Sequence, residues 1–148
     1  MSIDDAILNK PGRLTPEEFE IMKTHTTIGA DMLLELSRHH VGNALMEYAY
    51  QIARWHHERW DGRGYPDGLK GDEIPIAAQV VSVADVYDAL TSVRVYKDAI
   101  PHKEAIQMIL DGKCGTFNPL LLDCLLEVQD RIAETLARPA DVVAFPTI

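Results

Sequence analysis

Residues 75–91 read PIAAQVVSVADVYDALT, and this stretch decides the fold. When it is wound at about 3.6 residues per turn, Val, Ala and Leu lie on almost every side. A helix that is apolar nearly all round is a buried helix. The sequence therefore predicts that this helix is the centre of the domain.

Two helical patterns precede the central segment. The run TPEE at 15–18 is a capping box with proline in the first turn, which predicts a helix that runs to about Ser37. Apolar residues at helical spacing over 44–53 predict a second helix that leads directly into the two histidines at 56–57.

Two further patterns follow it. Residues 102–110 are amphipathic at helical spacing, and the pair Asn118-Pro119 predicts the start of a helix that runs to about residue 137. We find no repeat, no low-complexity tract and no alternating strand pattern that rivals the helices. The predicted fold is all-α: one bundle of about five or more helices over residues 1–138, followed by an irregular tail at 139–148.

A turn-rich loop separates the second helix from the central one. Residues 61–75 contain four glycines and two prolines, which break regular structure. Long loops inside a compact domain tend to be functional. We therefore expect this loop to contribute to a site.

The overall composition limits the classes of function. A chain of 148 residues with 47% hydrophobic content fits one compact domain. The net charge of −9 argues against binding to a DNA or RNA duplex, which relies on a clustered basic face. An anionic ligand would have to be bound by local positive charge, such as metal ions or a few placed cations.

The cysteines and the apolar runs bear on location. The two cysteines, Cys114 and Cys124, form no disulfide pattern, which predicts free thiols in a reducing compartment. No charged leader with an apolar run opens the sequence, and no run approaches the roughly 18 apolar residues of a membrane-spanning helix. We expect a cytoplasmic protein without a membrane segment.

Two carboxylates lie on the central helix. Asp85 and Asp88 are three residues apart, so their side chains share roughly one face of it. A buried carboxylate requires a partner, which is either a metal ion or the ordinary alternative of a cap or an arginine. This helix alone leaves the choice open.

Three histidines favour a metal. His56 and His57 end an apolar helical stripe, and His25 lies in the apolar stripe of residues 21, 28 and 32. Each alone is more simply a satisfied core residue. As a set with a buried Asp85, they form the mixed nitrogen and oxygen donor set typical of Fe or Mn, with Zn as an alternative.

The remaining histidines and two cations complete the candidates. His39, His40 and His102 lie among polar neighbours, which indicates solvated or capping residues. Arg94 and Lys97 follow the central helix within two turns, and two cations near a metal cluster suit the binding of a phosphate. Lone surface cations are the alternative interpretation.

The stretch HHERWDGRGYP at 56–66 resembles the HHE…GYP signature of HD-GYP domains. The same family has a Lys-x-His element, matched by 23–25, and a Val-Ala-Asp-Val-Tyr-Asp-Ala-Leu-Thr-Ser segment, matched by 83–92. Its Arg-x-x-Lys element is matched by Arg94 and Lys97. The resemblance covers about residues 5–127.

The resemblance implies a helical bundle that holds two or three divalent metal ions, commonly iron or manganese. These ions would activate a water or hydroxide for attack on a phosphodiester of cyclic di-GMP. The implied metal ligands are His25, His56, His57 and Asp85.

The resemblance also implies roles around the metal ions. Asp88 would orient or deprotonate the attacking hydroxide, and Tyr65 in the GYP loop would line the substrate cleft. Arg94 and Lys97 would hold the phosphate or the guanine.

The chain departs from the family near its start. The family's His-Asp pair and the lysine after it belong upstream of residues 4–8, and no His-Asp dipeptide occurs in this sequence. We therefore expect weaker metal binding and uncovered apolar faces on neighbouring helices. A trimmed or truncated chain is one interpretation, and a homodimer whose second chain supplies the missing layer is another.

Three functions remain open at this point. The first is a metal-dependent phosphodiesterase that acts on cyclic di-GMP. The second is a catalytically inactive module that binds cyclic di-GMP or docks onto a GGDEF-domain partner. The third is a metal-stabilised helical scaffold without a ligand.

Overall fold

The computed structural model describes residues 3–38, 43–93 and 98–137, and over these ranges the chain is helical without a β-strand. The elements in chain order are α1 (Asp5–Leu8), α2 (Pro16–Lys23), α3 (His25–Ser37), α4 (Ala44–Trp55), the 3₁₀ helix η1 (Gly71–Glu73), α5 (Ile76–Thr91), α6 (His102–Leu110) and α7 (Pro119–Ala137). The predicted all-α bundle is confirmed. The tail at 139–148 lies outside the described residues.

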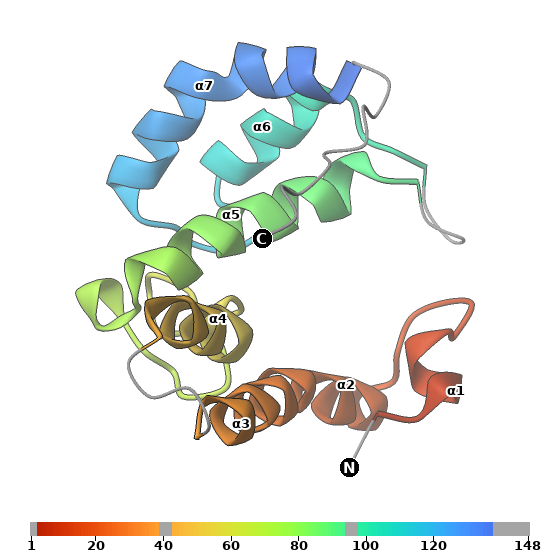
Figure 1. The fold of residues 1–148 in the computed structure, drawn as a ribbon. Helices are drawn as coiled ribbons and strands as arrows, with labels where there is room; N and C mark the ends of the chain where they lie inside the picture. Colours follow the sequence, from red (N-terminus) through yellow and green to blue (C-terminus); the bar gives the residue numbers. More distant parts are fainter. Residues whose placement is uncertain (1–2, 39–42, 94–97, 138–148) are drawn as a thin grey trace.

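Helix α5 crosses the middle of the molecule, with α6 and α7 on one side and α2, α3 and α4 on the other (Figure 1). The main core forms where α5 meets α6 and α7. Its buried side chains are Val83, Val86, Tyr87, Leu90, Ala105, Ile106, Ile109, Phe117 and Leu125. This arrangement agrees with the central position that the sequence predicts for residues 75–91.

One face of α5 is not buried, contrary to the prediction. Ile76, Val80 and Ala84 are exposed on it. Helices α4 and α6 make the main helix contacts of α5, and they leave this face uncovered among the described residues. The open face and α7 border an apolar groove of about 430 Å³.

The predicted helix from residue 15 to about 37 is two helices, α2 and α3, which are divided at Thr24. The capping box is present: the Glu18 amide donates to Oγ1 of Thr15, and the Thr15 amide donates to a Glu18 carboxylate oxygen. The helix divides because Thr24, His25 and the two threonines at 26–27 each bond back to the carbonyl three residues earlier. Side-chain donors that compete in this way bend helices.

This division also changes which side chains face inward. The outer members of the predicted stripe, Ile21 and Met32, are exposed. The expectation that the whole stripe points inward was therefore wrong, although His25 within it is half-buried.

Small residues allow α3 and α4 to lie close together. A Cβ added at Gly29 would lie 3.8 Å from Cβ of Ala53, and Ala30 is fully buried. The two helices form the most extensive helix pair among the described residues. This packing brings the start of α3, which carries His25, to the end of α4, which carries His56.

Core packing around α6 should dominate stability. Ile109 is 0% exposed, whereas Ile76 is 57% exposed. We expect Ile109→Ala to lower the free energy of unfolding by about 2–5 kcal/mol, because it removes buried contacts and leaves a cavity. The matched change Ile76→Ala should alter it by about 0.5 kcal/mol or less. Urea unfolding followed by circular dichroism measures both; equal losses would contradict the described core.

Candidate metal centre

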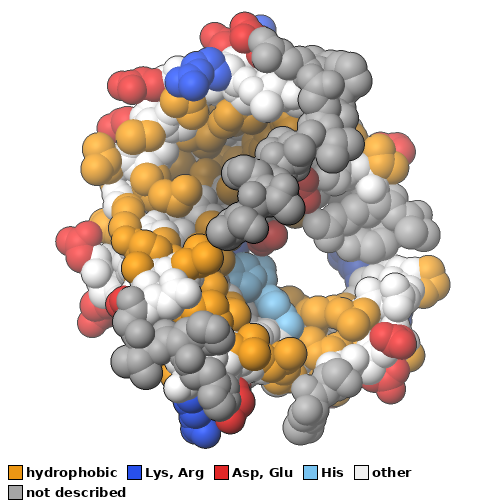
Figure 2. All heavy atoms as spheres, viewed as in Figure 1, with side chains coloured by type: hydrophobic (Ala, Val, Ile, Leu, Met, Phe, Trp, Pro, Cys, Tyr) orange, Lys and Arg blue, Asp and Glu red, His pale blue; other side chains and the backbone are white. Residues whose placement is uncertain are grey.

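Two helix ends and one loop form the candidate site. His25 is the first residue of α3, His56 caps the end of α4, and His57 follows it. All three are half-buried, and one nitrogen of each lies within 4.8 Å of the others. The structure therefore brings the three predicted histidines together. In Figure 2, histidine side chains lie at the edge of an open hollow in the surface.

The orientation of two of these rings is fixed by backbone carbonyls. Nδ1 of His25 lies 2.7 Å from the Met22 carbonyl oxygen, and Nδ1 of His56 lies 2.8 Å from the Ile52 carbonyl oxygen. A carbonyl oxygen can accept but not donate, so each Nδ1 carries the proton and donates. Each Nε2 then presents a lone pair.

These two lone pairs face each other. Nε2 of His25 lies 3.2 Å from Nε2 of His56, and with both protons on Nδ1 no hydrogen bond joins them. Two nitrogen ligands of one metal ion lie about 2.9–3.4 Å apart, because each metal–nitrogen bond measures roughly 2.1 Å. The pair therefore fits a single divalent cation, and the paired carbonyls are the second partners that metal-binding histidines usually have.

His57 supplies the third nitrogen donor. Burial, together with the neighbouring His56 and His25 rings and Arg59, lowers the pKa of His57 to about 3. The ring is therefore neutral near pH 7, as a metal ligand must be. It stacks on the Tyr65 ring at 4.7 Å between centroids.

The two aspartates are not buried, which corrects the sequence-based expectation. The Asp85 side chain is 45% exposed, and one of its oxygens lies 4.0 Å from Nδ1 of His57. Asp88 is also exposed, and its carboxylate accepts a hydrogen bond from the Ser92 hydroxyl. Both project from the uncovered side of α5, so no buried charge demands a partner. Asp85 nevertheless lies beside the histidines, where it can add an oxygen donor.

The predicted phosphate-binding cations, Arg94 and Lys97, lie outside the described residues. Lys23, the lysine of the Lys-x-His element, is a further cation near the site, and no role was predicted for it. Nζ of Lys23 lies 5.7 Å from the Tyr65 ring and 5.6 Å from the Phe19 ring. The site thus has a described cation beside the tyrosine of its loop.

Glu58 is a further residue to which the sequence argument gave no role. Its side chain is 2% exposed, and Oε1 accepts hydrogen bonds from the Asp67 and Gly68 amides at 2.7 Å and 3.0 Å. Burial raises the pKa of Glu58, while these amides oppose the rise. The sequence shows only an acid after two histidines, just before a turn-rich loop, and does not indicate which amides it would meet.

The loop returns to the end of α4 at close range. A Cβ added at Gly64 would lie 2.4 Å from Cα of Glu58 and 2.5 Å from the Arg59 nitrogen, so only glycine fits. The Tyr65 amide donates to the His57 carbonyl oxygen at 3.2 Å. The loop backbone is thereby held directly against the histidine segment.

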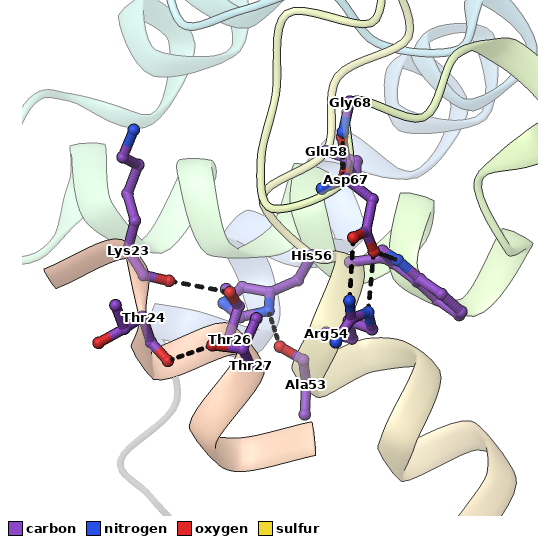
Figure 3. A network of polar contacts seen from close by, with 11 residues as sticks. Lys23, Thr24, Thr26, Thr27, Ala53, Arg54, His56, Glu58, Asp67 and Gly68 are labelled. Carbon is purple, nitrogen blue, oxygen red and sulfur yellow. Dashed lines mark hydrogen bonds and ion pairs between the residues drawn. The ribbon is translucent and has the colours of Figure 1, made fainter. Parts of the chain in front are cut away.

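The other end of the loop is bound to α4 by side chains. The Asp67 carboxylate accepts hydrogen bonds from Arg54 and from the Trp55 indole at 2.7–2.9 Å (Figure 3). The Arg54 guanidinium holds the pKa of Asp67 below its usual value. A charge-assisted, two-point pair of this kind fixes geometry well.

The last described histidine is not part of the cluster, and it is neither solvated nor a helix cap, contrary to the expectation. His102 begins α6, and its Nδ1 shares a hydrogen bond of 2.8 Å with the Tyr87 hydroxyl. It joins α6 to α5 instead. His39 and His40 lie outside the described residues.

Three histidines gathered at helix ends, with an exposed aspartate of α5 beside them, form a donor set of the kind that metal-dependent helical domains use. A family model described as an HD domain matches residues 2–119. The chain belongs to this family, and its 56–66 stretch is the HD-GYP signature. The HD domain implies divalent-metal binding, and a cluster of three histidines that could hold an ion is present.

Curated relatives agree with this assignment. The chain is 44% identical over 143 residues to a probable cyclic di-GMP phosphodiesterase of Vibrio cholerae serotype O1, covering 95% of this chain and 32% of that protein. It is 46% identical over 143 residues to a cyclic di-GMP phosphodiesterase of Thermotoga maritima, covering 95% and 37%.

A third relative has a different named substrate. The chain is 41% identical over 130 residues to a 3'3'-cGAMP-specific phosphodiesterase 2 of Vibrio cholerae serotype O1, covering 88% of this chain and 24% of that protein. The chain therefore spans about a third or less of the length of these relatives. None of its described helices is long and apolar enough to cross a membrane.

Metal binding should depend on the clustered histidines. We expect His56→Ala to weaken the binding of Mn(II) or Zn(II) by about 100-fold or more, because it removes one ligand of a closely spaced pair. His102→Ala should leave metal affinity unchanged, since His102 contacts Tyr87 and lies outside the cluster. Isothermal titration calorimetry checks both variants. Unchanged affinity in His56→Ala would exclude the assigned centre.

The glycine of the GYP loop should be irreplaceable. Gly64→Ala should lower the free energy of unfolding by about 1–3 kcal/mol, because its methyl group would overlap backbone atoms that cannot move aside freely. In Gly29→Ala the new methyl group meets Ala53 at an ordinary 3.8 Å, so little change is expected. Urea unfolding separates the two; similar stability for both variants would contradict the close approach.

Proposed function

We propose that this domain is a metal-dependent phosphodiesterase that hydrolyses cyclic di-GMP. The observation that carries the proposal is the facing pair of Nε2 lone pairs at 3.2 Å, beside His57 and Asp85. The names of the relatives support the substrate class, and cyclic dinucleotides are common to all three described above. The proposal places hydrolysis in the cytoplasm.

His25, His56, His57 and Asp85 would hold the metal. The HD-GYP resemblance favours two or three ions, with Fe or Mn as the native metals and Zn as an alternative. When bound, such ions lower the pKa of water and offset negative charge on phosphoryl oxygens. Imidazole ligands suit this task because, unlike carboxylates, they add no negative charge to the site.

The remaining residues would act on the water and the dinucleotide. The Asp88 carboxylate would orient or deprotonate the attacking water from the exposed side of α5. Tyr65 would line the substrate cleft, and burial raises the pKa of Tyr65 to about 12, so its hydroxyl stays protonated and able to donate. Arg94 and Lys97 would bind the phosphate or the guanine.

Association with other chains is a separate expectation. A homodimer and a GGDEF-domain partner both stay predictions, since no partner chain is described. Analytical ultracentrifugation of the metal-loaded chain decides the first, and a binding titration with a GGDEF domain decides the second.

Activity is tested with the chain under anaerobic Fe(II) and with Mn(II), using cyclic di-GMP as substrate and chromatography of the products. We expect hydrolysis that His56→Ala abolishes. Asp88→Asn should lower kcat by about 100-fold or more while metal content is retained, because a general base is lost. Arg94→Ala should raise KM and leave metal in place.

Asp72→Asn is the matched control, since Asp72 is an exposed acid in η1. It should leave kcat and KM unchanged. Bound metal without hydrolysis under either condition would refute the phosphodiesterase proposal and leave the metal centre intact.

A further inference from the structure

We propose that Glu58 is the positioning residue of this site: its carboxylate fixes the turn at 64–68 and thereby places the Tyr65 ring against His57. The inference rests on the proposed function for its effect on substrate binding. Its structural part stands on contacts within the described chain.

Glu58 is placed to act on the loop and not on the metal. Oε1 accepts from two successive amides, those of Asp67 and Gly68, which close the turn that contains Tyr65 (Figure 3). The metal-binding cluster of three histidines does not include it. Its contacts therefore lie one step away from the chemistry, on the loop that carries Tyr65.

The turn is held at both ends, and Tyr65 lies between. At the near end Gly64 lies directly on the backbone of His57 and Glu58, and the Tyr65 amide donates to His57. At the far end, the Glu58 carboxylate accepts hydrogen bonds from the amides of residues 67 and 68. With both ends fixed, the Tyr65 ring stacks on His57 at an interplanar angle of 27°.

Stability alone does not account for an acid at this position. Burying a carboxylate is costly unless both oxygens are paired, and Oε2 of Glu58 is buried without a hydrogen-bond partner among the described residues. What this side chain provides is length, which brings one acceptor oxygen to both amides.

A second contact competes for the same role. The Asp67 side chain is bound to Arg54 and Trp55, which also ties the far end of the turn to α4. That contact fixes a side chain, whereas Glu58 fixes the orientation of two peptide groups. The test must therefore show that Glu58 is needed while the Asp67 contact is intact.

Three substitutions separate the effect of side-chain length at residue 58 from the effect of its charge. Glu58→Gln keeps an acceptor oxygen at the same distance from the backbone, Glu58→Asp keeps the charge but is one methylene too short, and Glu58→Ala keeps neither. If Glu58 positions the turn, the Glu58→Gln variant should keep the Tyr65 ring on His57 as in the wild type. Glu58→Asp should lose this contact, as Glu58→Ala should. If its charge acts on the metal, the order should reverse. Glu58→Gln also keeps the test valid if Glu58→Ala fails to fold.

The structural readout is the ring-current shift that Tyr65 causes on His57. Proton–nitrogen spectra of histidine-labelled, metal-free chain report it, with the His57 signal assigned from His57→Gln and the unstacked value taken from Tyr65→Leu. We expect the shift to persist in Glu58→Gln and to be lost in Glu58→Asp. Glu73→Ala is the matched control, because Glu73 also accepts a backbone amide, that of Lys70, in the same loop but at its surface. It should keep the shift.

The functional readout is KM for cyclic di-GMP. Tyr65→Leu and Glu58→Asp should each raise KM by about tenfold, the scale of one lost base-stacking contact. In the Tyr65→Leu background, Glu58→Asp should add less than about twofold, because it acts through the same ring. A purely structural role would lower stability without this coupling.

The outcomes are distinct. Retention of the His57 shift in Glu58→Asp would overturn the inference and assign the turn to Asp67. Loss of the shift in Glu58→Gln with retention in Glu58→Asp would overturn it in favour of a charge effect. Absence of cyclic di-GMP hydrolysis in the wild type would refute the proposed function, while the spectra would still decide what Glu58 does.

Discussion

The hydrogen bonds that two histidine rings donate to carbonyls at the ends of α2 and α4 are the constraint on which the site depends. A carbonyl oxygen has two lone pairs, so it can accept a ring N–H beside a backbone amide. Here Nδ1 of His25 donates to the Met22 carbonyl, and Nδ1 of His56 donates to the Ile52 carbonyl, which also accepts the His56 amide. The same kind of bond thus anchors two rings at helix ends, selects the tautomer of both and directs both Nε2 atoms to a common point.

A second constraint follows from the first, because the segment after α4 has to leave the helix without covering the histidines. The chain turns away at His57 and returns at Gly64 so closely that no side chain fits between. Arg59 of the same segment points inward. Its guanidinium donates to the Ser82 hydroxyl of α5 and lies over the Phe117 ring. The face of this segment that carries the histidine cluster and the face that packs on α5 are therefore two sides of one backbone.

Sequence reasoning predicted what depends on local patterns. Capping residues located the starts of α2 and α7, and spacing located α5 and α6, because caps and apolar periodicity act within a few residues. It failed at Thr24, where a run of hydroxyl donors outweighed a continuous apolar pattern. It failed again for Asp85, because the composition of α5 says how apolar the helix is but not which neighbours cover it.

The same distinction separates the site residues that could be predicted from the sequence from those that could not. The three histidines could be predicted because metal-ligating residue types stood at inward spacing, and the 56–66 signature was specific. The role of Glu58 could not, since it depends on where residues 67–68 return in space, about ten positions along the chain. A carboxylate with an obvious surface partner is easy to assign from sequence, whereas one that serves two distant amides is visible only in the fold.

The uncovered side of α5 connects the fold to the chemistry. A helix buried all round would have to neutralise Asp85 and Asp88, because ionised carboxylates are not tolerated in an apolar core without partners. By packing on one face alone, α5 uses Val83, Val86 and Leu90 for stability and leaves both carboxylates exposed, with Asp85 beside His57. The apolar exposure at Ile76 and Val80 is the structural consequence of that division, so the side of α5 that leaves apolar side chains uncovered is also the side on which both carboxylates reach solvent.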